Sequence, residues 1–206
     1  QQPIIFDRTT GEMTGATPWE RTIGLALLAG SKVGAYMSHR GYNSAANLLK
    51  AMFLSERDIN VMLNQDAAFS FPYGDGYWSK LLNRSFSYEN ELELLFRDSA
   101  DIDYTLLDCG ANYGYWSVLV SSKPFGSRKA IAIEPSGQNF PKLANNAKIN
   151  GNRFEAMKCA IGAARGTARK LPSSYRSNGV SSNPIRTNAK AMLVTSACAT
   201  LIDNGK

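Results

Sequence analysis

The stretch Thr105-Leu-Leu-Asp-Cys-Gly-Ala-Asn-Tyr-Gly-Tyr-Trp-Ser117, followed by Ala130-Ile-Ala-Ile-Glu-Pro-Ser136, decides the fold of this chain. The first piece runs from apolar residues into an acid and two glycines, and then into a helix-like pattern. The second is another short apolar run, and it ends on Glu134, 20 residues after Gly114. Alpha/beta proteins hold a ribose-containing ligand with a parallel strand, a glycine-bearing turn, a helix and a second strand that ends in an acid. The pattern therefore predicts an α/β fold that binds a nucleoside.

The turn differs from a dinucleotide-binding turn. The dinucleotide fingerprint requires Gly-x-Gly-x-x-Gly, whereas here Asn112 takes the place of the middle glycine between Gly110 and Gly114. Asp108 directly precedes the turn, where a carboxylate would repel a pyrophosphate but suits a cationic ligand such as the amino acid part of S-adenosylmethionine. A lone strand-glycine-helix turn is also an ordinary structural connection, but Asp108 and Glu134 together favour cofactor binding.

Five short blocks, in this order, resemble the FkbM-like methyltransferase family. They are Leu-Asp-Cys-Gly-Ala-Asn-Tyr-Gly-Tyr-Trp-Ser (107–117), Ala-Ile-Glu-Pro-Ser (132–136), the group Asn139, Phe140, Leu143 and Asn146, Cys-Ala-Ile-Gly (159–162), and Ala-Thr-Leu-Ile-Asp (199–203). The similarity covers roughly residues 88–206. Members of that family transfer a methyl group from S-adenosylmethionine, commonly to oxygen on sugars, glycolipids or polyketide-type molecules. The resemblance implies a Rossmann-like class I methyltransferase domain, S-adenosylmethionine as cofactor, and a small-molecule or glycan acceptor.

The resemblance also implies which residues contact the cofactor, since they lie in the blocks that match. They are Asp108, Gly110, Ala111, Asn112, Gly114, Tyr115, Trp116, Glu134, Pro135, Ser136, Asn139 and Ala160. We assign no catalytic base, because His39, the one histidine, lies outside the resembling region. The alternative function is a non-catalytic module that binds a nucleoside or a glycan.

Composition narrows the class of protein and its partners. The chain has 206 residues, of which 44% are hydrophobic and 19% charged, as in an ordinary globular protein. The net charge of +6 favours anionic partners, but no run of Lys and Arg reaches the length of a nucleic-acid tract, so no nucleic acid is expected. Three cysteines without a C-x-x-C pair, together with a single histidine, argue against a metal site or a disulfide framework and favour a reducing, cytoplasmic compartment. The apolar run 23–29 is too short to span a membrane.

Residues 1–87 are expected to form a mainly helical, aromatic-rich extension. Residues 1–20 are interpreted as a loose arm, and helices are predicted over 19–37 and 45–54, with a strand over 59–63. The aromatic segment 69–78 is interpreted as turn-rich. Its Tyr73, Tyr77 and Trp78 either seal a sheet or stack on a sugar or on adenine. Ser87 is expected to cap a helix that runs to about Asp98 and buries Leu92, Leu95 and Phe96.

Residues 88–206 are expected to form a partial S-adenosylmethionine-binding domain with strand order 3-2-1. The predicted strands are 105–108, 130–134 and 155–160, and the predicted helices are 115–122 and 138–150. A further strand, 168–171, is expected to pair with 191–195 across a long loop, 172–188. The family continues beyond the last matching block, so we expect a C-terminally truncated domain. Its first strand would be an open edge through which the chain could form oligomers.

Overall fold

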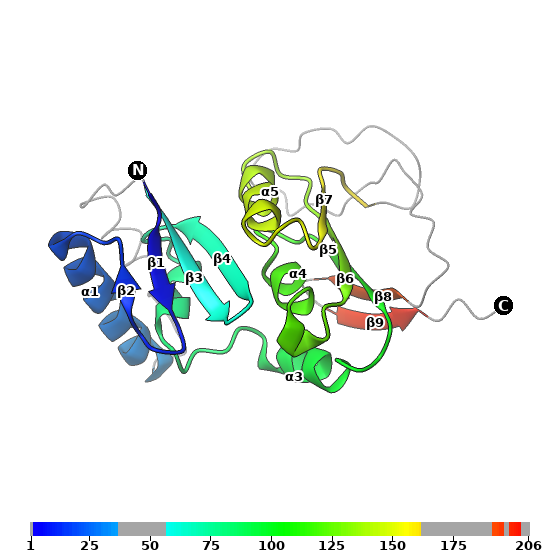
Figure 1. The fold of residues 1–206 in the computed structure, drawn as a ribbon, viewed down its shortest axis with the longest axis horizontal. Coiled ribbons are helices and arrows are strands. Elements are labelled where there is room, and N and C mark those ends of the chain that lie inside the picture. Colours follow the sequence, from blue (N-terminus) through cyan, green and yellow to red (C-terminus); the bar gives the residue numbers. More distant parts are fainter. Residues whose placement is uncertain (1, 37–56, 162–190, 196–197, 203–206) are drawn as a thin grey trace. The chain divides into compact units, whose positions relative to one another are not determined.

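The computed structural model describes residues 2–36, 57–161, 191–195 and 198–202, and the chain divides into two compact units, 1–94 and 95–206 (Figure 1). The predicted division lay a few residues earlier, after residue 87. The helix predicted over 45–54, the strand predicted over 168–171, the loop 172–188 and His39 lie outside the described residues.

The first unit contains a four-stranded sheet beside its helices, and the prediction of a mainly helical extension did not include this sheet. Its sheet has the order β2-β1-β3-β4, with β1 parallel to β3 and the other pairs antiparallel. The prediction of a loose arm is wrong, because its apolar residues form β1, whose Ile4 pairs with Ile59 far along the chain. The elements are β1 (Ile4–Asp7), β2 (Met13–Thr14), α1 (Pro18–Tyr36), β3 (Asp58–Asn64), β4 (Ala67–Pro72) and the 3-10 helix η1 (Trp78–Leu82).

One face of this sheet is the core of the first unit. Alternate residues of the strands point to one face, and the register pairs Ile59 with Phe71 and Val61 with Phe69, all four of them fully buried. The segment predicted to be turn-rich therefore begins as a strand. Trp78 closes the core by packing edge-on against Phe69 with ring centroids 4.7 Å apart. Of the three aromatic residues that were expected either to seal a sheet or to stack on a ligand, Tyr73 and Trp78 are buried, whereas Tyr77 is 43% exposed.

A partly buried ion pair joins α1 to Arg57, the residue that directly precedes β3. Arg57 Nη1 donates to both carboxylate oxygens of Glu20, at 3.1 and 2.8 Å, and its Nη2 donates to the backbone oxygens of Gln2 and Gly15. Burial alone would raise the pKa of Glu20. Hydrogen bonds from Thr17 and Arg57, with the charge of Arg57, outweigh it, so that the pKa lies below its ordinary value.

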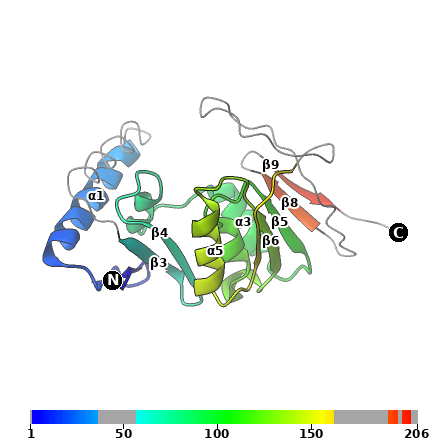
Figure 2. The same cartoon turned by 90° about the horizontal axis from the view of Figure 1, so that it is seen from above.

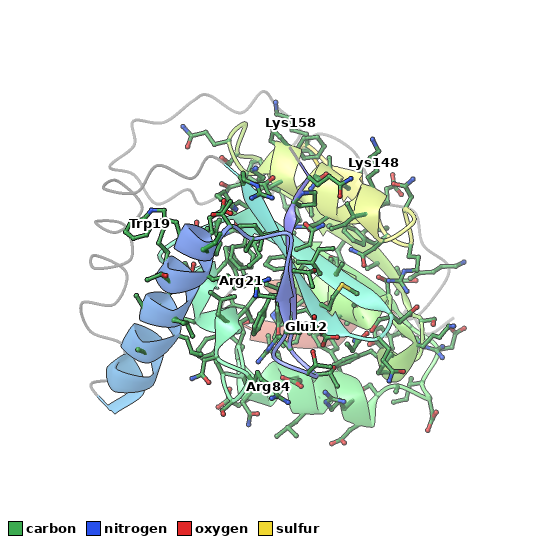
Figure 3. The ribbon with its side chains drawn as sticks, turned by 60° about the vertical axis from the view of Figure 1, so that its left-hand side comes forward. Glu12, Trp19, Arg21, Arg84, Lys148 and Lys158 are labelled. Atoms are coloured by element: carbon green, nitrogen blue, oxygen red, sulfur yellow. The ribbon has the colours of Figure 1, made fainter. Side chains whose placement is uncertain are left out.

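Replacing Glu20 with glutamine is expected to lower the free energy of unfolding by about 1–2 kcal/mol at pH 7, because a partly buried ion pair is replaced by a hydrogen bond to a neutral acceptor. A carboxylate whose pKa is lowered by folding contributes stability above its unfolded pKa, about 4.3 for Glu, and this contribution is lost as the pH falls further. The difference between wild type and variant should therefore shrink below that pH in urea titrations. Glu12, an exposed carboxylate of the same unit (Figure 3), is the control, and Glu12→Gln should change stability by less than about 0.5 kcal/mol. A gap between wild type and Glu20→Gln that stays constant down to pH 3 would contradict the assignment.

The second unit is a Rossmann-like α/β fold, as predicted. Its five-stranded sheet has the order β7-β6-β5-β8-β9, in which the first four strands are parallel and β9 is antiparallel to β8. The expected 3-2-1 order is confirmed in β7-β6-β5. The elements are α3 (Asn90–Asp98, which crosses the division), β5 (Thr105–Cys109), α4 (Tyr115–Val120), the 3-10 helix η2 (Lys123–Phe125), β6 (Lys129–Ile133), α5 (Phe140–Ile149), β7 (Glu155–Met157), β8 (Ala191–Thr195) and β9 (Cys198–Ile202).

The prediction that the first strand of this sheet is an open edge is wrong. Strand β8 pairs with β5 over its whole length, from Thr105 opposite Ala191 to Cys109 opposite Thr195. Strand β5 is therefore the central strand of the sheet. Among the described residues, β7 and β9 are the edge strands. Residues 191–195 were predicted to pair with 168–171 instead. The local pattern of a strand does not specify which strand lies beside it in the sheet.

Helices cover one face of this sheet. Figure 2 shows α3 and α5 on the same side of the strands. In register, Leu106 lies beside Ala130 and Asp108 beside Ala132, and all four residues are buried. Helix α3 begins at Asn90 rather than after Ser87, whose hydroxyl instead donates to Glu93. It buries Phe96 but leaves Leu95 38% exposed, contrary to expectation.

Candidate cofactor-binding site

The first turn of the candidate site joins the end of β5 to the start of α4. Its residues Gly110, Asn112 and Gly114 have φ of +80°, +53° and +84°. Glycine adopts this left-handed region freely, and asparagine tolerates it better than most residues. The backbone N–H groups of Gly110 and Ala111 both donate to the carbonyl of Ile133, each at 2.9 Å. The turn is thereby fastened to the carboxyl end of β6, next to the place where ligands bind in open α/β sheets.

Glu134 joins this turn to the next one. Its Oε2 accepts a hydrogen bond from the backbone N–H of Asn112, and its Oε1 accepts one from the backbone N–H of Ser136, both at 2.8 Å. The side chain is only 5% exposed. The structure thus places the predicted ribose acid beside the predicted glycine turn. Each carboxylate oxygen already accepts one backbone hydrogen bond and has further acceptor capacity.

The two glycines of the turn have different surroundings. A Cβ atom added to Gly110 would meet no atom of the described residues within 4 Å, whereas one added to Gly114 would lie 2.5 Å from Leu143 Cδ1. Gly110 therefore leaves open space above the turn, and Gly114 lets α4 start in contact with α5. The sequence pattern gave both glycines the same role, but only Gly110 has room for a ligand against it.

Two polar side chains of this region are buried. Asp108 is 5% exposed, and its Oδ2 accepts a hydrogen bond of 2.8 Å from the hydroxyl of Ser117 on α4. Asn112 Oδ1 is buried and has no hydrogen-bond partner among the residues that the structure describes. A buried acceptor without a partner is uncommon in folded proteins, and a donor group on a ligand would satisfy it.

Other predicted residues contribute to packing. Tyr115 and Trp116 are 4% and 5% exposed in α4, and Trp116 packs against Phe96 with ring centroids 5.3 Å apart. Ala111 is 8% exposed. Ala160 is half-buried and follows β7, which ends at Met157 rather than at residue 160. Contact of these four residues with a cofactor stays a prediction.

The second turn follows Glu134 and leads into α5. The hydroxyl of Ser136 accepts hydrogen bonds from the backbone N–H groups of Gln138 and Asn139, and Pro135 is exposed. A cation borders this turn, since Lys158 Nζ lies 3.8 Å from where a Cβ of Gly137 would be; Figure 3 labels this side chain.

Sequence reasoning missed two supporting residues. Ser117 holds Asp108, and Asn146, fully buried on α5, donates from Nδ2 to the backbone oxygen of Tyr113 in the first turn. In the sequence, Asn146 stood out only as a member of the third block that resembles the FkbM-like family, without a predicted role. The signal that could have found both is a polar residue at a buried position of an apolar helix, because such a residue needs a hydrogen-bond partner.

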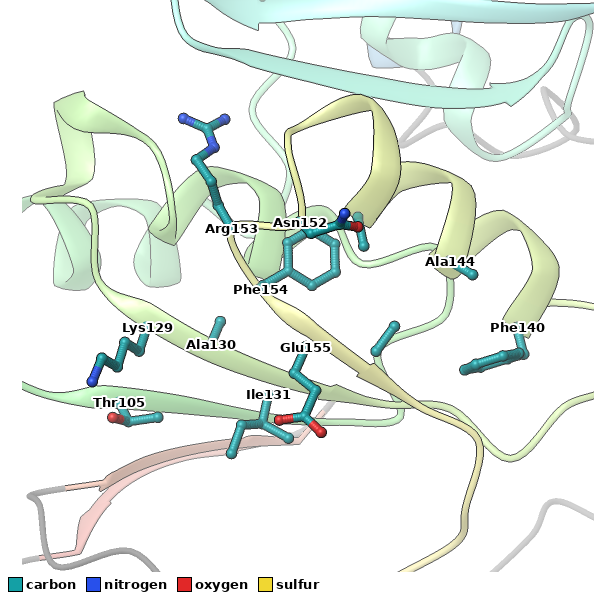
Figure 4. Close-up of a pocket in the computed structure, with 12 residues that line it drawn as sticks. Thr105, Lys129, Ala130, Ile131, Phe140, Ala144, Asn152, Arg153, Phe154 and Glu155 are labelled. Carbon is teal, nitrogen blue, oxygen red and sulfur yellow. The ribbon is translucent and has the colours of Figure 1, made fainter.

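A separate groove of about 770 Å³ runs along the β7 edge of the sheet (Figure 4). Its strand residues include Thr105, Lys129 and Glu155, the first residues of β5, β6 and β7, and its helix residues include Phe140 and Ala144 of α5. None of the predicted cofactor residues lines it. Because ligands of open α/β sheets bind at the carboxyl ends of the strands, this groove is not the candidate site.

Three further observations concern metal binding, thiol chemistry and membrane-spanning helices among the described residues. They contain no group of three or more His, Cys, Asp or Glu side chains that could hold a metal ion. Burial, helped by Asp108 and Cys159, raises the pKa of Cys109 to about 12, so its side chain is a thiol at neutral pH. In the part of the chain that the structure describes, no helix is long and apolar enough to cross a membrane.

Comparisons with known proteins add little to what the structure shows. No protein-family model matches the chain, and no curated protein matches it. Among solved structures, TYW2 of Pyrococcus horikoshii in complex with MeSAdo and a putative transferase of Pyrococcus horikoshii each align at 14% identity with a TM-score of 0.32. Each alignment covers 58% of this chain and 48% of the other, so the chain spans about half the length of these structures. A likeness of this size carries no functional argument, and the Rossmann-like assignment stands on the sheet order described above.

Proposed function

We propose that the chain is an S-adenosylmethionine-dependent methyltransferase of the FkbM-like type that methylates oxygen on a sugar, glycolipid or polyketide-type acceptor. The observation that supports this most is a turn in which no described residue fills the Cβ position of Gly110, Asn112 Oδ1 is buried without a partner among the described residues, and Glu134 accepts the Asn112 N–H. A left-handed glycine with open space also occurs at Gly151. The support therefore comes from the combination of Gly110 with Asn112 and Glu134 at one turn.

The residues present suit the cofactor. Asp108 offers a carboxylate to a cationic amino acid part, Glu134 retains acceptor capacity for a ribose diol, and Asn112 offers an amide oxygen to a donor. S-adenosylmethionine supplies an electrophilic methyl group when it is bound. The contribution of the chain is to hold ligand and acceptor in line and to exclude water, which can provide much of the acceleration in a displacement reaction.

Titration calorimetry of the full chain with S-adenosylhomocysteine tests the cofactor assignment, and methyl transfer to a panel of glycan and small hydroxyl acceptors tests the reaction. Saturable binding with a 1:1 stoichiometry is expected. Binding without turnover on any acceptor would instead support the non-catalytic nucleoside-binding module. No binding at all would contradict both. The cytoplasmic location and self-association stay predictions from the sequence.

Replacing Glu134 with alanine is expected to weaken S-adenosylhomocysteine binding at least tenfold. The variant loses acceptors for the ribose hydroxyls, and hydrogen bonds to charged groups are worth about 1.5–3 kcal/mol each. It also frees the backbone N–H groups of Asn112 and Ser136, so both turns lose their common anchor. A ligand analogue that lacks the ribose hydroxyls should lose comparable affinity for the wild type. A change of less than twofold in the variant would show that Glu134 has no role toward the ligand.

A further inference from the structure

Ser117 is a buried polar residue in an otherwise apolar helix. Helix α4 has the sequence Tyr-Trp-Ser-Val-Leu-Val, all of it buried, and Ser117 is fully buried within it. An alanine would serve the packing of this position as well, without the cost of removing a hydroxyl group from water. We therefore expect the hydroxyl group of Ser117 to have a function that alanine could not provide.

The hydroxyl group of Ser117 donates to a carboxylate. Its Oγ lies 2.8 Å from Oδ2 of Asp108, on the adjacent strand β5. A hydrogen bond to one carboxylate oxygen favours one orientation of the carboxylate. The side chain of Asp108 is thus held from the helix side, next to the turn that begins with Gly110.

The turn and Ser117 are also coupled through the backbone. Gly114 starts α4, and its carbonyl accepts the N–H of Val118 at 2.9 Å. The first turn of the helix that carries Ser117 is therefore continuous with the candidate site. A shift of the glycine turn would therefore move the hydroxyl group of Ser117 relative to the carboxylate of Asp108. A change in this hydrogen bond would likewise shift the glycine turn.

We propose that Ser117 is a positioning residue that orients the Asp108 carboxylate toward the ammonium group of the amino acid part of S-adenosylmethionine. This inference rests on the proposed function, because it assigns one part of the same ligand to one pair of residues. It predicts that Ser117 affects ligands with an amino acid part and has no effect on ligands that lack one.

The test compares two ligands by titration calorimetry. S-adenosylhomocysteine carries the amino acid part, and 5′-methylthioadenosine carries the same nucleoside without it. Ser117→Ala should weaken S-adenosylhomocysteine about tenfold and change methylthioadenosine less than twofold. Asp108→Asn, which keeps an acceptor for Ser117 but removes the charge, should show the same split. Ser117→Thr, which keeps the hydroxyl group, should restore most of the affinity for S-adenosylhomocysteine.

A matched control is available directly after the same helix. Ser121 is also buried, but its hydroxyl donates to the backbone oxygen of Val118 rather than to a carboxylate. Ser121→Ala should change both affinities less than twofold. If Ser117→Ala does not fold, Ser117→Cys can replace it, because cysteine has a similar shape and a weaker hydrogen-bond donor. This variant should also weaken S-adenosylhomocysteine more than methylthioadenosine, but by a smaller factor.

Three outcomes separate the possibilities. Equal weakening of both ligands by Ser117→Ala would overturn the proposal and make Ser117 a structural residue only. Unchanged affinity for both ligands would overturn it as well. A wild type that binds neither ligand would instead refute the proposed function, so the two failures are distinguishable.

Discussion

Replacing Gly110 with valine is expected to abolish detectable binding of S-adenosylhomocysteine, a loss of at least about a hundredfold, while the chain remains folded. Gly110 has φ of +80°, and in the described part of the chain no atom lies within 4 Å of the position that its Cβ would take. A branched side chain there would strain the turn by about 1–3 kcal/mol and fill the space that the ligand needs. Calorimetry with the ligand and a thermal unfolding curve of the same sample measure both effects.

Gly151 is the matched control for this variant. It has φ of +69° and likewise nothing within 4 Å of its Cβ position, but it follows the end of α5, outside both turns of the site. Gly151→Val should therefore cost similar stability with no change in ligand affinity. The assignment of the pocket is wrong if Gly110→Val retains wild-type affinity, or if the two variants lose affinity to the same extent.

Replacing Gly114 with alanine is expected to destabilise the second unit by about 2–6 kcal/mol. The added methyl group would lie 2.5 Å from Leu143 Cδ1, and the position has φ of +84°. Overpacking a core typically costs about 1–3 kcal/mol, and a non-glycine residue with positive φ adds about 1–3 kcal/mol of strain. Such a loss is a large fraction of the stability of a domain, and the denaturant midpoint measures it.

A double-mutant cycle with Leu143→Ala separates the clash from the strain. Leu143→Ala alone should destabilise the unit, because Leu143 is fully buried. The double variant should cost less than the sum of the two single variants, because the shortened side chain makes room for the added methyl group. Strict additivity would show that only the backbone conformation makes glycine necessary here. If Gly114→Ala costs less than about 0.5 kcal/mol, the packing role is wrong altogether.

The local sequence pattern was sufficient to predict most strands and helices of the second unit. The strands at 105–109 and 129–133 and helix α5 were predicted to within about two residues at each end, and the strand order 3-2-1 is confirmed. Their hydrophobic periods and glycine-bearing turns are properties of neighbouring residues, so they are visible in sequence. The pairing of the glycine turn with Glu134 could also be expected, because adjacent parallel strands present their carboxyl ends at the same edge.

Partners far apart in the chain could not be predicted in the same way. The arm that becomes β1 pairs with β3 more than 50 residues later, and β5 takes β8 as its second neighbour. Short apolar runs are compatible with several partners, and the burial gained by the whole sheet selects among them. The same limit explains why a helical extension was expected where a sheet exists.

Within the candidate site, the sequence determined which residue types stand at the turns, because left-handed backbone and close ligand approach require glycine or asparagine. Only the tertiary structure decided what each of them does. Gly114 turned out to make room for Leu143 and Gly110 to leave open space, although both occupy the same motif. Likewise, one hydrogen bond to Glu134 comes from Asn112, 22 positions before it, and one to Asp108 comes from Ser117, 9 positions after it. A side chain's role depends on the atoms packed around it, and those atoms are brought together by the fold.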